Sequence, residues 1–356
     1  MLSQRARADR ARQGVARGIA WGWMTRVSWR SPAMVRPLVH LSDLPPRLGK
    51  DPSIELRRFR GHELYEQQLG HLRIGHLTDL HFGRVTPMAV QRAAVTLLNA
   101  QRPDLVVITG DFVCHSQLYL DELVSVLSKI EAPTIGVLGN HDYWSGADEV
   151  AHALKRADVE LLKNQNTTRT IRGERIQIVG LDDAYTGHAD RQKALAGIDP
   201  RIATLGLSHI AEEADAMWSA GVPMVLAGHT HAGQVTLARL HELAMGRFVG
   251  HKYVHGLYGS RKLDVTVPGA VYVGAGIGAA IMPIRLGDRG RRELTIFELG
   301  ERAPAVDEHH DEQAPLPGRK PSPEVTAKRH AAVHEKMWKR EQAAARATTK
   351  RWGRAV

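Results

Sequence analysis

Cysteine, aromatic residues and long apolar runs are all scarce in this chain. Its 356 residues include one cysteine, Cys114, so no disulfide can form within the chain and nothing in its framework requires an oxidising compartment. No apolar stretch approaches the roughly 18 residues of a membrane-spanning helix, so we expect none. The Arg-rich N-terminus has no continuous apolar core, which disfavours a secretory signal peptide. Hydrophobic residues still make up 43% of the chain, as in an ordinary globular protein.

Basic residues outnumber acidic ones at the two ends of the chain. The net charge is +10, of which residues 1–50 carry +8 and residues 301–356 carry +4, leaving −2 for the remainder. This distribution disfavours nucleic-acid binding by the body and indicates basic arms attached to it. We therefore expect a basic arm over 1–54, a folded body over 55–300, and a charged linker with a solvated helix or disordered tail over 301–356.

The N-terminal arm combines tryptophans with arginines in "ARGIAWGWMTRVSWR", residues 16–30. Trp and Arg together favour the headgroup zone of a bilayer, so residues 12–30 predict contact with an anionic membrane surface. Packing of the arm against the body and contact with nucleic acid are the alternatives. The first interpretation places the protein in the cytoplasm, peripheral at the inner face of the membrane.

Short apolar runs alternate with amphipathic ones through the body, which predicts parallel βαβ units with later antiparallel additions. One helix is expected over 86–101, with Thr86 as its N-cap and Pro87 at its first position. A hairpin is expected to turn at Arg172, Gly173 and Glu174. The fold class predicted is α/β, a mixed β-sandwich flanked by helices. The remaining strands are expected at 72–80, 104–109, 134–139, 202–208, 223–228, 270–276 and 292–299, and the remaining helices at 117–130, 146–157 and 212–221.

Polar residues gather where five of the predicted strands end. The carboxyl ends of parallel strands share one edge of a sheet, which is where ligands bind. Singly, each aspartate has a helix-capping alternative and each histidine can be a satisfied polar group. The nine residues are Asp79, His81, Asp111, Asn140, His141, Asp142, His209, His229 and His231.

Together these side chains predict a metal centre, because carboxylate, imidazole and amide oxygen suit divalent Mn, Fe or Zn. Nine donors exceed the needs of one ion and indicate two that share a carboxylate. Adjacent glycines, Gly110, Gly139 and Gly228, would let the backbone turn sharply and let a ligand approach. Since a strand points alternate residues to one side, an extended His229–His231 segment could reach both ions.

The segments "DLH", "GDFV", "GNHD", "SH" and "GHTH", in this order, resemble the calcineurin-like metallophosphoesterase family over about 71–300. The surrounding "LTDLHFG", "VLGNHDYW" and "LAGHTHAGQV" are similar to a bacterial branch that includes membrane-associated phosphodiesterases and UDP-diacylglucosamine hydrolases. The resemblance implies the calcineurin-like phosphoesterase fold and Asp111 as the residue that bridges two metals. It implies a first metal held by Asp79, His81 and His231, and a second held by Asn140, His209 and His229.

The chemistry implied is metal-dependent hydrolysis of a phosphoric ester. Two cations neutralise an anionic phosphoester and make hydroxide available at neutral pH. His141 is placed to protonate the leaving oxygen, and Asp142 either orients that imidazole or caps a helix. We expect the substrate to contain a phosphodiester or pyrophosphate bond and to be lipid-linked or a nucleotide.

Two departures from the family pattern bear on the metals. Cys114 stands where relatives commonly have a second aspartate, which predicts altered hydrogen bonding around a metal, and a buried packing role is its alternative. "SHIAEEAD" lacks the Pro and Asp that usually follow His209. A protein phosphatase or nuclease is an alternative on the same site, although "DFVCHS" lacks the arginine of those phosphatases. A non-catalytic scaffold is disfavoured because every proposed ligand is present.

Overall fold

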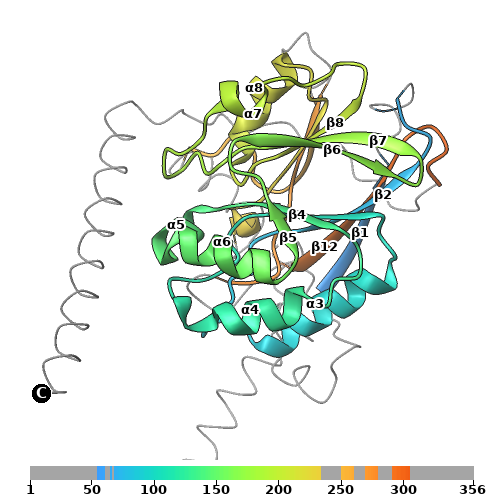
Figure 1. The fold of residues 1–356 in the computed structure, drawn as a ribbon. Helices are drawn as coiled ribbons and strands as arrows, with labels where there is room; N and C mark the ends of the chain where they lie inside the picture. Colours follow the sequence, from blue (N-terminus) through green and yellow to red (C-terminus); the bar gives the residue numbers. More distant parts are fainter. Residues whose placement is uncertain are drawn as a thin grey trace, which may run out of the picture.

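The computed structural model describes residues 54–60, 65, 68–233, 250–259, 269–279 and 291–304. Within them the chain forms two six-stranded sheets that pack face to face, with helices on both outer faces (Figure 1). The mixed β-sandwich flanked by helices is therefore confirmed. The N-terminal arm before residue 54 and the tail beyond residue 304 lie outside the described residues, so the predicted domain boundaries stay predictions.

The first sheet carries the βαβ units expected from the alternating pattern. Its order is β1-β12-β2-β3-β4-β5, and β2 to β5 run parallel to one another. The strand β12 is antiparallel to β2 and parallel to the edge strand β1. The strands are β1 (Ile54–Arg60), β2 (Leu72–Leu77), β3 (Leu105–Thr109), β4 (Thr134–Val137), β5 (Val159–Leu161) and β12 (Arg292–Leu299).

The second sheet has the order β10-β11-β9-β8-β7-β6. Its four central strands are parallel, and the two edge strands, β6 and β10, are antiparallel to their neighbours. The strands are β6 (Gln165–Ile171), β7 (Glu174–Gly180), β8 (Ala203–Leu207), β9 (Met224–Ala227), β10 (Gly256–Gly259) and β11 (Ala270–Val273). The turn between β6 and β7 falls at Arg172 and Gly173, both at positive φ, as the predicted hairpin requires.

Helices cover the two sheets unequally. The first sheet is covered by α3 (Met88–Ala100), α4 (Leu120–Leu127), α5 (Asn140–Ser145) and α6 (Ala147–Arg156), and α7 (Arg191–Ala194) and α8 (Ala214–Ser219) lie over the second (Figure 1). The 3-10 turns are η2 (Gln117–Tyr119), η3 (Ala211–Glu213) and η4 (His231–Gly233). Within the described ranges, every helix is too short or too polar to cross a bilayer.

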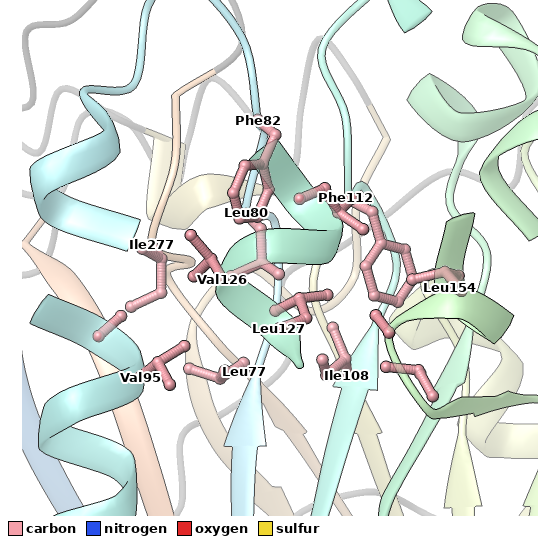
Figure 2. Close-up of a cluster of buried hydrophobic side chains, with 14 of the residues drawn as sticks. Leu77, Leu80, Phe82, Val95, Ile108, Phe112, Val126, Leu127, Leu154 and Ile277 are labelled. Atoms are coloured by element: carbon pink, nitrogen blue, oxygen red, sulfur yellow. The ribbon is translucent and has the colours of Figure 1, made fainter. Parts of the chain in front are cut away.

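The core has three layers that match this arrangement. Figure 2 shows part of the layer between the first sheet and its helices, where Leu77 and Ile108 lie near Val126 and Leu127 of α4. A second cluster fills the space between the two sheets, and a third packs Trp218 of α8 against the second sheet. Burial on both faces explains why the parallel strands read as continuous apolar runs.

Several details differ from the expectations, and the short elements β5, β10, α5 and α7 were not predicted. The helix α3 begins at Met88 with Pro87 at its N-cap position, and Thr86 does not cap it. Instead the Thr86 hydroxyl accepts the Ala279 N–H at 3.0 Å, so it ties the helix start to the strand-end segment after β11. The edge strand β1 was not expected from the pattern, because its three arginines obscure the alternation and its pairing with β12 is remote in sequence.

A buried carboxylate, Glu293 on β12, links the two sheets. It accepts the Tyr272 hydroxyl at 2.5 Å, lies 2.8 Å from His255 Nε2 and lies 3.0 Å from Arg57 Nε. Burial raises the pKa of Glu293, but Arg57 and His255 outweigh that effect and hold it well below its usual range. The segment that Glu293 anchors also contacts the site, because the carbonyl of Val254, next to His255, accepts the hydroxyl of Thr230.

Candidate metal centre

The ends of five strands, β2, β3, β4, β8 and β9, bring the seven predicted ligands together. Five of the seven have positive φ: Asp79 (50°), His81 (46°), Asp111 (55°), His229 (76°) and His231 (51°). Non-glycine residues in this region cost on the order of 1–3 kcal/mol each and persist only where the surroundings impose them. The surroundings here are backbone hydrogen bonds between strand ends, such as Asp79 N to Gly110 O at 3.0 Å and His81 N to Asp111 O at 2.9 Å.

The extended segment expected for His229 and His231 is wrong. Both residues have a left-handed backbone conformation with positive φ, and His231 is the first residue of the 3-10 turn η4. The two imidazoles still point to different groups of side chains, because a left-handed turn separates them instead of strand alternation. Thr230 between them is buried and held by the carbonyl of Val254.

Two glycines make the close approach of the backbone possible, as predicted. A Cβ on Gly139 would collide with the carboxylate of Asp111, and a Cβ on Gly228 would collide with Thr78 and the carboxylate of Asp79. Gly110 has φ +87°, which supplies the sharp turn before Asp111.

The first group consists of Asp79, His81 and His231, with Asp111 beside it. One ligand atom from each of these four buried residues lies within 4.8 Å of all the others. The two imidazole nitrogens, Nε2 of His81 and Nε2 of His231, are 2.9 Å apart, and His231 Nε2 is 3.4 Å from Asp79 Oδ1. Donor atoms that converge on one point in this way fit a divalent cation between them.

The second group consists of Asn140, His209 and His229. Nε2 of His209 is 3.2 Å from Asn140 Oδ1 and 3.3 Å from His229 Nδ1. Nδ1 of His209 donates to the carbonyl of Thr109 at 2.8 Å, so Nε2 is the nitrogen that would bind a metal, with the cation taking the place of its proton. The departure after His209 in the sequence therefore does not displace its side chain from this group.

Asp111 stands between the two groups. Its Oδ2 atom is 3.4 Å from Nε2 of His81 and 3.4 Å from Nε2 of His209. Its other oxygen, Oδ1, accepts the backbone N–H of His141 at 2.8 Å, which fixes the orientation of the carboxylate. One oxygen is thus shared by both sets of imidazoles, which is the geometry of a bridging ligand.

Burial and mutual charge divide the pKa values within the centre. Burial raises the pKa of Asp79 to about 6, although His209 opposes the rise. Burial also opposes ionisation of Asp111, but the imidazoles around it, His209 first, hold the pKa of Asp111 well below its usual range. Burial disfavours a charged His209, yet the Asp111 carboxylate outweighs this and raises the pKa of His209 to about 10. The pKa of His229 is lowered by burial and by the neighbouring His209.

The two predicted catalytic residues differ in their surroundings. The His141 ring lies edge-on to the His81 ring, with centroids 4.7 Å apart, beside the first group of ligands. The Asp142 carboxylate accepts the N–H of Gly139 at 2.9 Å and the N–H of Val113 at 3.1 Å. The bond from Gly139, the N-cap of α5, is that of the helix-capping alternative, and the bond from Val113 ties α5 to the loop after β3. An orienting role of Asp142 toward His141 stays a prediction.

Several residues near the centre were missed or underused in the sequence interpretation. Cys114 lies beside two site residues and is not only a packing residue. One potential ligand atom each of His81, Cys114 and His141 lies within 4.8 Å of the other two. Burial, with the Asp111 charge, raises the pKa of the Cys114 thiol to about 11. Rings of His115 and Trp144 border His141, and rings of Tyr185 and His251 border His229. His115 and Trp144 stood in the quoted segments "DFVCHS" and "VLGNHDYW", whereas Tyr185 and His251 come from loops outside every motif.

Comparison with known proteins agrees with this geometry. Residues 72–233 match the family model described as calcineurin-like phosphoesterase. The chain is 29% identical over 231 residues to phosphodiesterase YaeI of Escherichia coli (strain K12), covering 63% of this chain and 80% of YaeI. It is 26% identical over 233 residues to the uncharacterized metallophosphoesterase YkuE of Bacillus subtilis (strain 168), covering 64% and 78%. It is 27% identical over 217 residues to UDP-2,3-diacylglucosamine pyrophosphatase LpxG of Chlamydia trachomatis, covering 47% and 65%.

Over residues 72–233, and in its similarity to these relatives, the chain resembles the calcineurin-like metallophosphoesterase family. It is a metal-dependent phosphoric ester hydrolase, and the resemblance of its strand-end motifs to this family is confirmed.

Proposed function

We propose that this protein is a dinuclear hydrolase of phosphodiester or pyrophosphate bonds, and that its substrate is lipid-linked or a nucleotide. The proposed first metal is held by Asp79, His81 and His231, and the second by Asn140, His209 and His229. Mn, Fe and Zn are the candidate ions, because the donors are carboxylate, imidazole and amide oxygen.

The observation that carries the proposal is the position of Asp111. Its Oδ2 atom lies at the same distance, 3.4 Å, from one imidazole of each group. A mononuclear centre would need only one of these groups, whereas this carboxylate oxygen serves both. The buried carboxylates also gain from bound cations, which would compensate the negative charge that burial penalises.

When two divalent cations are bound, they supply the charge that neutralises the phosphoryl group and makes hydroxide available at neutral pH. The protein itself supplies positioning and a proton. His141 lies beside His81, and its backbone N–H holds the Asp111 carboxylate, so its imidazole is fixed at the edge of the centre. From there it would protonate the leaving alkoxide or phosphate oxygen.

The lipid-linked option draws on two relatives and on the arm. LpxG is named as a pyrophosphatase of UDP-2,3-diacylglucosamine and YaeI as a phosphodiesterase. Residues 12–30, which lie outside the described residues, would hold the enzyme at the anionic inner face of the cytoplasmic membrane. Nucleic acid is the less suitable partner, because residues 51–300 together carry only −2.

Elemental analysis together with a substrate panel tests the proposal. We expect two metal ions per chain and hydrolysis of phosphodiesters or nucleotide-diphospho-lipids above that of phosphomonoesters. Asp111→Asn should lower the occupancy of both positions. Asp158→Asn is the matched control, because Asp158 also has positive φ (59°) but is exposed after α6. One tightly bound metal in the wild type, unchanged by Asp111→Asn, would exclude the bridging role.

A further inference from the structure

A band of aromatic rings lies on the partly exposed side of the metal centre. We define the aromatic arc as His115, Trp144, Tyr185 and His251. His115 is exposed and the other three are half-buried, whereas the metal-ligand candidates Asp79, His81, Asp111, Asn140 and His209 are almost completely buried. The arc is therefore more exposed than these five ligand candidates.

The rings form a continuous series from His141 to His229, a member of the second group of ligands. Trp144 is 4.7 Å from the His141 ring, and His115 stacks parallel to Trp144 at 5.7 Å. Tyr185 is 6.0 Å from Trp144 and 5.2 Å from His229. His251 completes the series at 5.2 Å from His229. All values are distances between ring centroids.

Four separate segments supply these rings, so no local sequence requirement places them together. His115 follows β3, Trp144 lies on α5, Tyr185 lies in the loop after β7, and His251 precedes β10. Carboxylates hold the two loop segments. Asp183 accepts the N–H groups of Tyr185 at 3.3 Å and Thr186 at 2.8 Å, and Glu212 lies 3.2 Å from His251 Nδ1.

The chemistry of the arc favours a planar group over an acyl chain. All four members of the arc are rings with a π-face, and none of the four positions is aliphatic. Stacking of a base on an aromatic side chain contributes about 1–3 kcal/mol and tolerates any base, because every base has a π-face. A flexible acyl chain would be better matched by a groove of branched aliphatic side chains.

We propose that the aromatic arc binds the part of the substrate that remains attached to the phosphoryl group, and that this part is a nucleoside base. This inference rests on the proposed phosphodiester or pyrophosphate hydrolysis and narrows it to a nucleotide-containing substrate. Trp144 and Tyr185 supply the stacking surface beside the two groups of ligands. The arc makes and breaks no bond, so it acts on binding of the substrate.

Calorimetric titration of the Mn²⁺-loaded full chain tests this with three probes: uridine 5′-monophosphate, ribose 5-phosphate and dihexanoyl phosphatidic acid. We expect the nucleotide to bind at least tenfold more tightly than ribose 5-phosphate, which differs by lacking the base. Trp144→Ala and Tyr185→Ala should each weaken nucleotide binding by roughly 5- to 150-fold, the range that corresponds to one stacking contact. Ribose 5-phosphate binding should change little.

Trp144→Phe and Tyr185→Phe are the matched variants, because they keep a π-face, and both should retain most of the preference for the base. Metal content and melting temperature, measured for every variant, separate loss of stacking from loss of the centre. Equal wild-type affinity for nucleotide and ribose 5-phosphate overturns the proposal. So does a base preference that survives both alanine substitutions, or a loss confined to the phosphatidic acid. If the base preference holds but no diester or pyrophosphate is cleaved, the arc stands and the proposed hydrolysis fails.

Discussion

Gly139→Ala tests whether the position of the Asp111 carboxylate decides metal binding. Gly139 has φ −113° and ψ 177°, a conformation that alanine adopts readily, so the substitution acts through its Cβ alone. That Cβ would contact the Asp111 carboxylate and would lie 2.6 Å from Asp111 N and 2.9 Å from His209 Cε1. Ordinary contacts begin at 3.4 Å, so the neighbours must move by several tenths of an ångström. Both neighbours are ligand candidates.

Displacement of about 1 Å in an active site can lower the rate by about 10²-fold. We therefore expect Gly139→Ala to lower kcat/KM on a model diester by about 10- to 100-fold and to reduce metal content. Gly75→Ala is the steric control, since its Cβ would lie 2.6 Å from Leu98 Cδ1 in the core. It should lower the melting temperature while keeping the metals. Full metal content and wild-type kcat/KM in Gly139→Ala would refute the reasoning.

Three further predictions concern the acid, the buried carboxylate and the arm. His141→Ala should keep its metals but lose about 10²–10⁴-fold in rate on substrates with poor leaving groups, whereas activated aryl esters lose much less. Equal losses on both would remove the acid role. Glu293→Gln should cost roughly 3–5 kcal/mol in urea unfolding at pH 7. Because folding lowers the pKa of Glu293, the ionised carboxylate stabilises the wild type at pH values above the ordinary carboxyl pKa, and this stabilisation is lost as the pH falls below it. A difference in unfolding free energy between wild type and Glu293→Gln that does not change with pH would contradict the ion-pair account. The full chain should sediment with anionic liposomes at low salt, because each basic residue near the surface contributes on the order of 1 kcal/mol of attraction. A chain that starts at Asp51 should not sediment with them. Equal sedimentation of both would give the arm another function.

The sheet and its ligand-bearing edge were predictable because they depend on local pattern. Buried parallel strands read as apolar runs, and the polar residues that end them follow at once, so Asp79, Asp111 and Asn140 could be placed at one edge. The same logic found the hairpin, because Arg172 and Gly173 fall between two alternating segments. The strand β1 was missed, because its place depends on pairing with a segment more than two hundred residues away.

The details of the site depended on tertiary context that no spacing shows. Thr86 is a good capping residue, but the Ala279 N–H is buried beside it and takes its hydroxyl as acceptor instead. Asp142 likewise serves backbone N–H groups of α5 and of the loop after β3. Tyr185 and His251 reach the centre on loops whose course is set by Asp183 and Glu212, so their sequence neighbours gave no signal.

The strained backbone and the buried charges of the centre share one source of stability. A left-handed backbone conformation at aspartate or histidine disfavours folding, and so does burial of a carboxylate away from water. These residues are tolerated because they extend from strands buried on both faces, and because the backbone N–H groups of His141 and His229 hold the Asp111 and Asp79 carboxylates. The sandwich thus fixes donor atoms close together before any cation arrives. Such preorganisation leaves most of the free energy of cation binding available for affinity and for positioning a phosphoester, and less is spent on ordering the ligands.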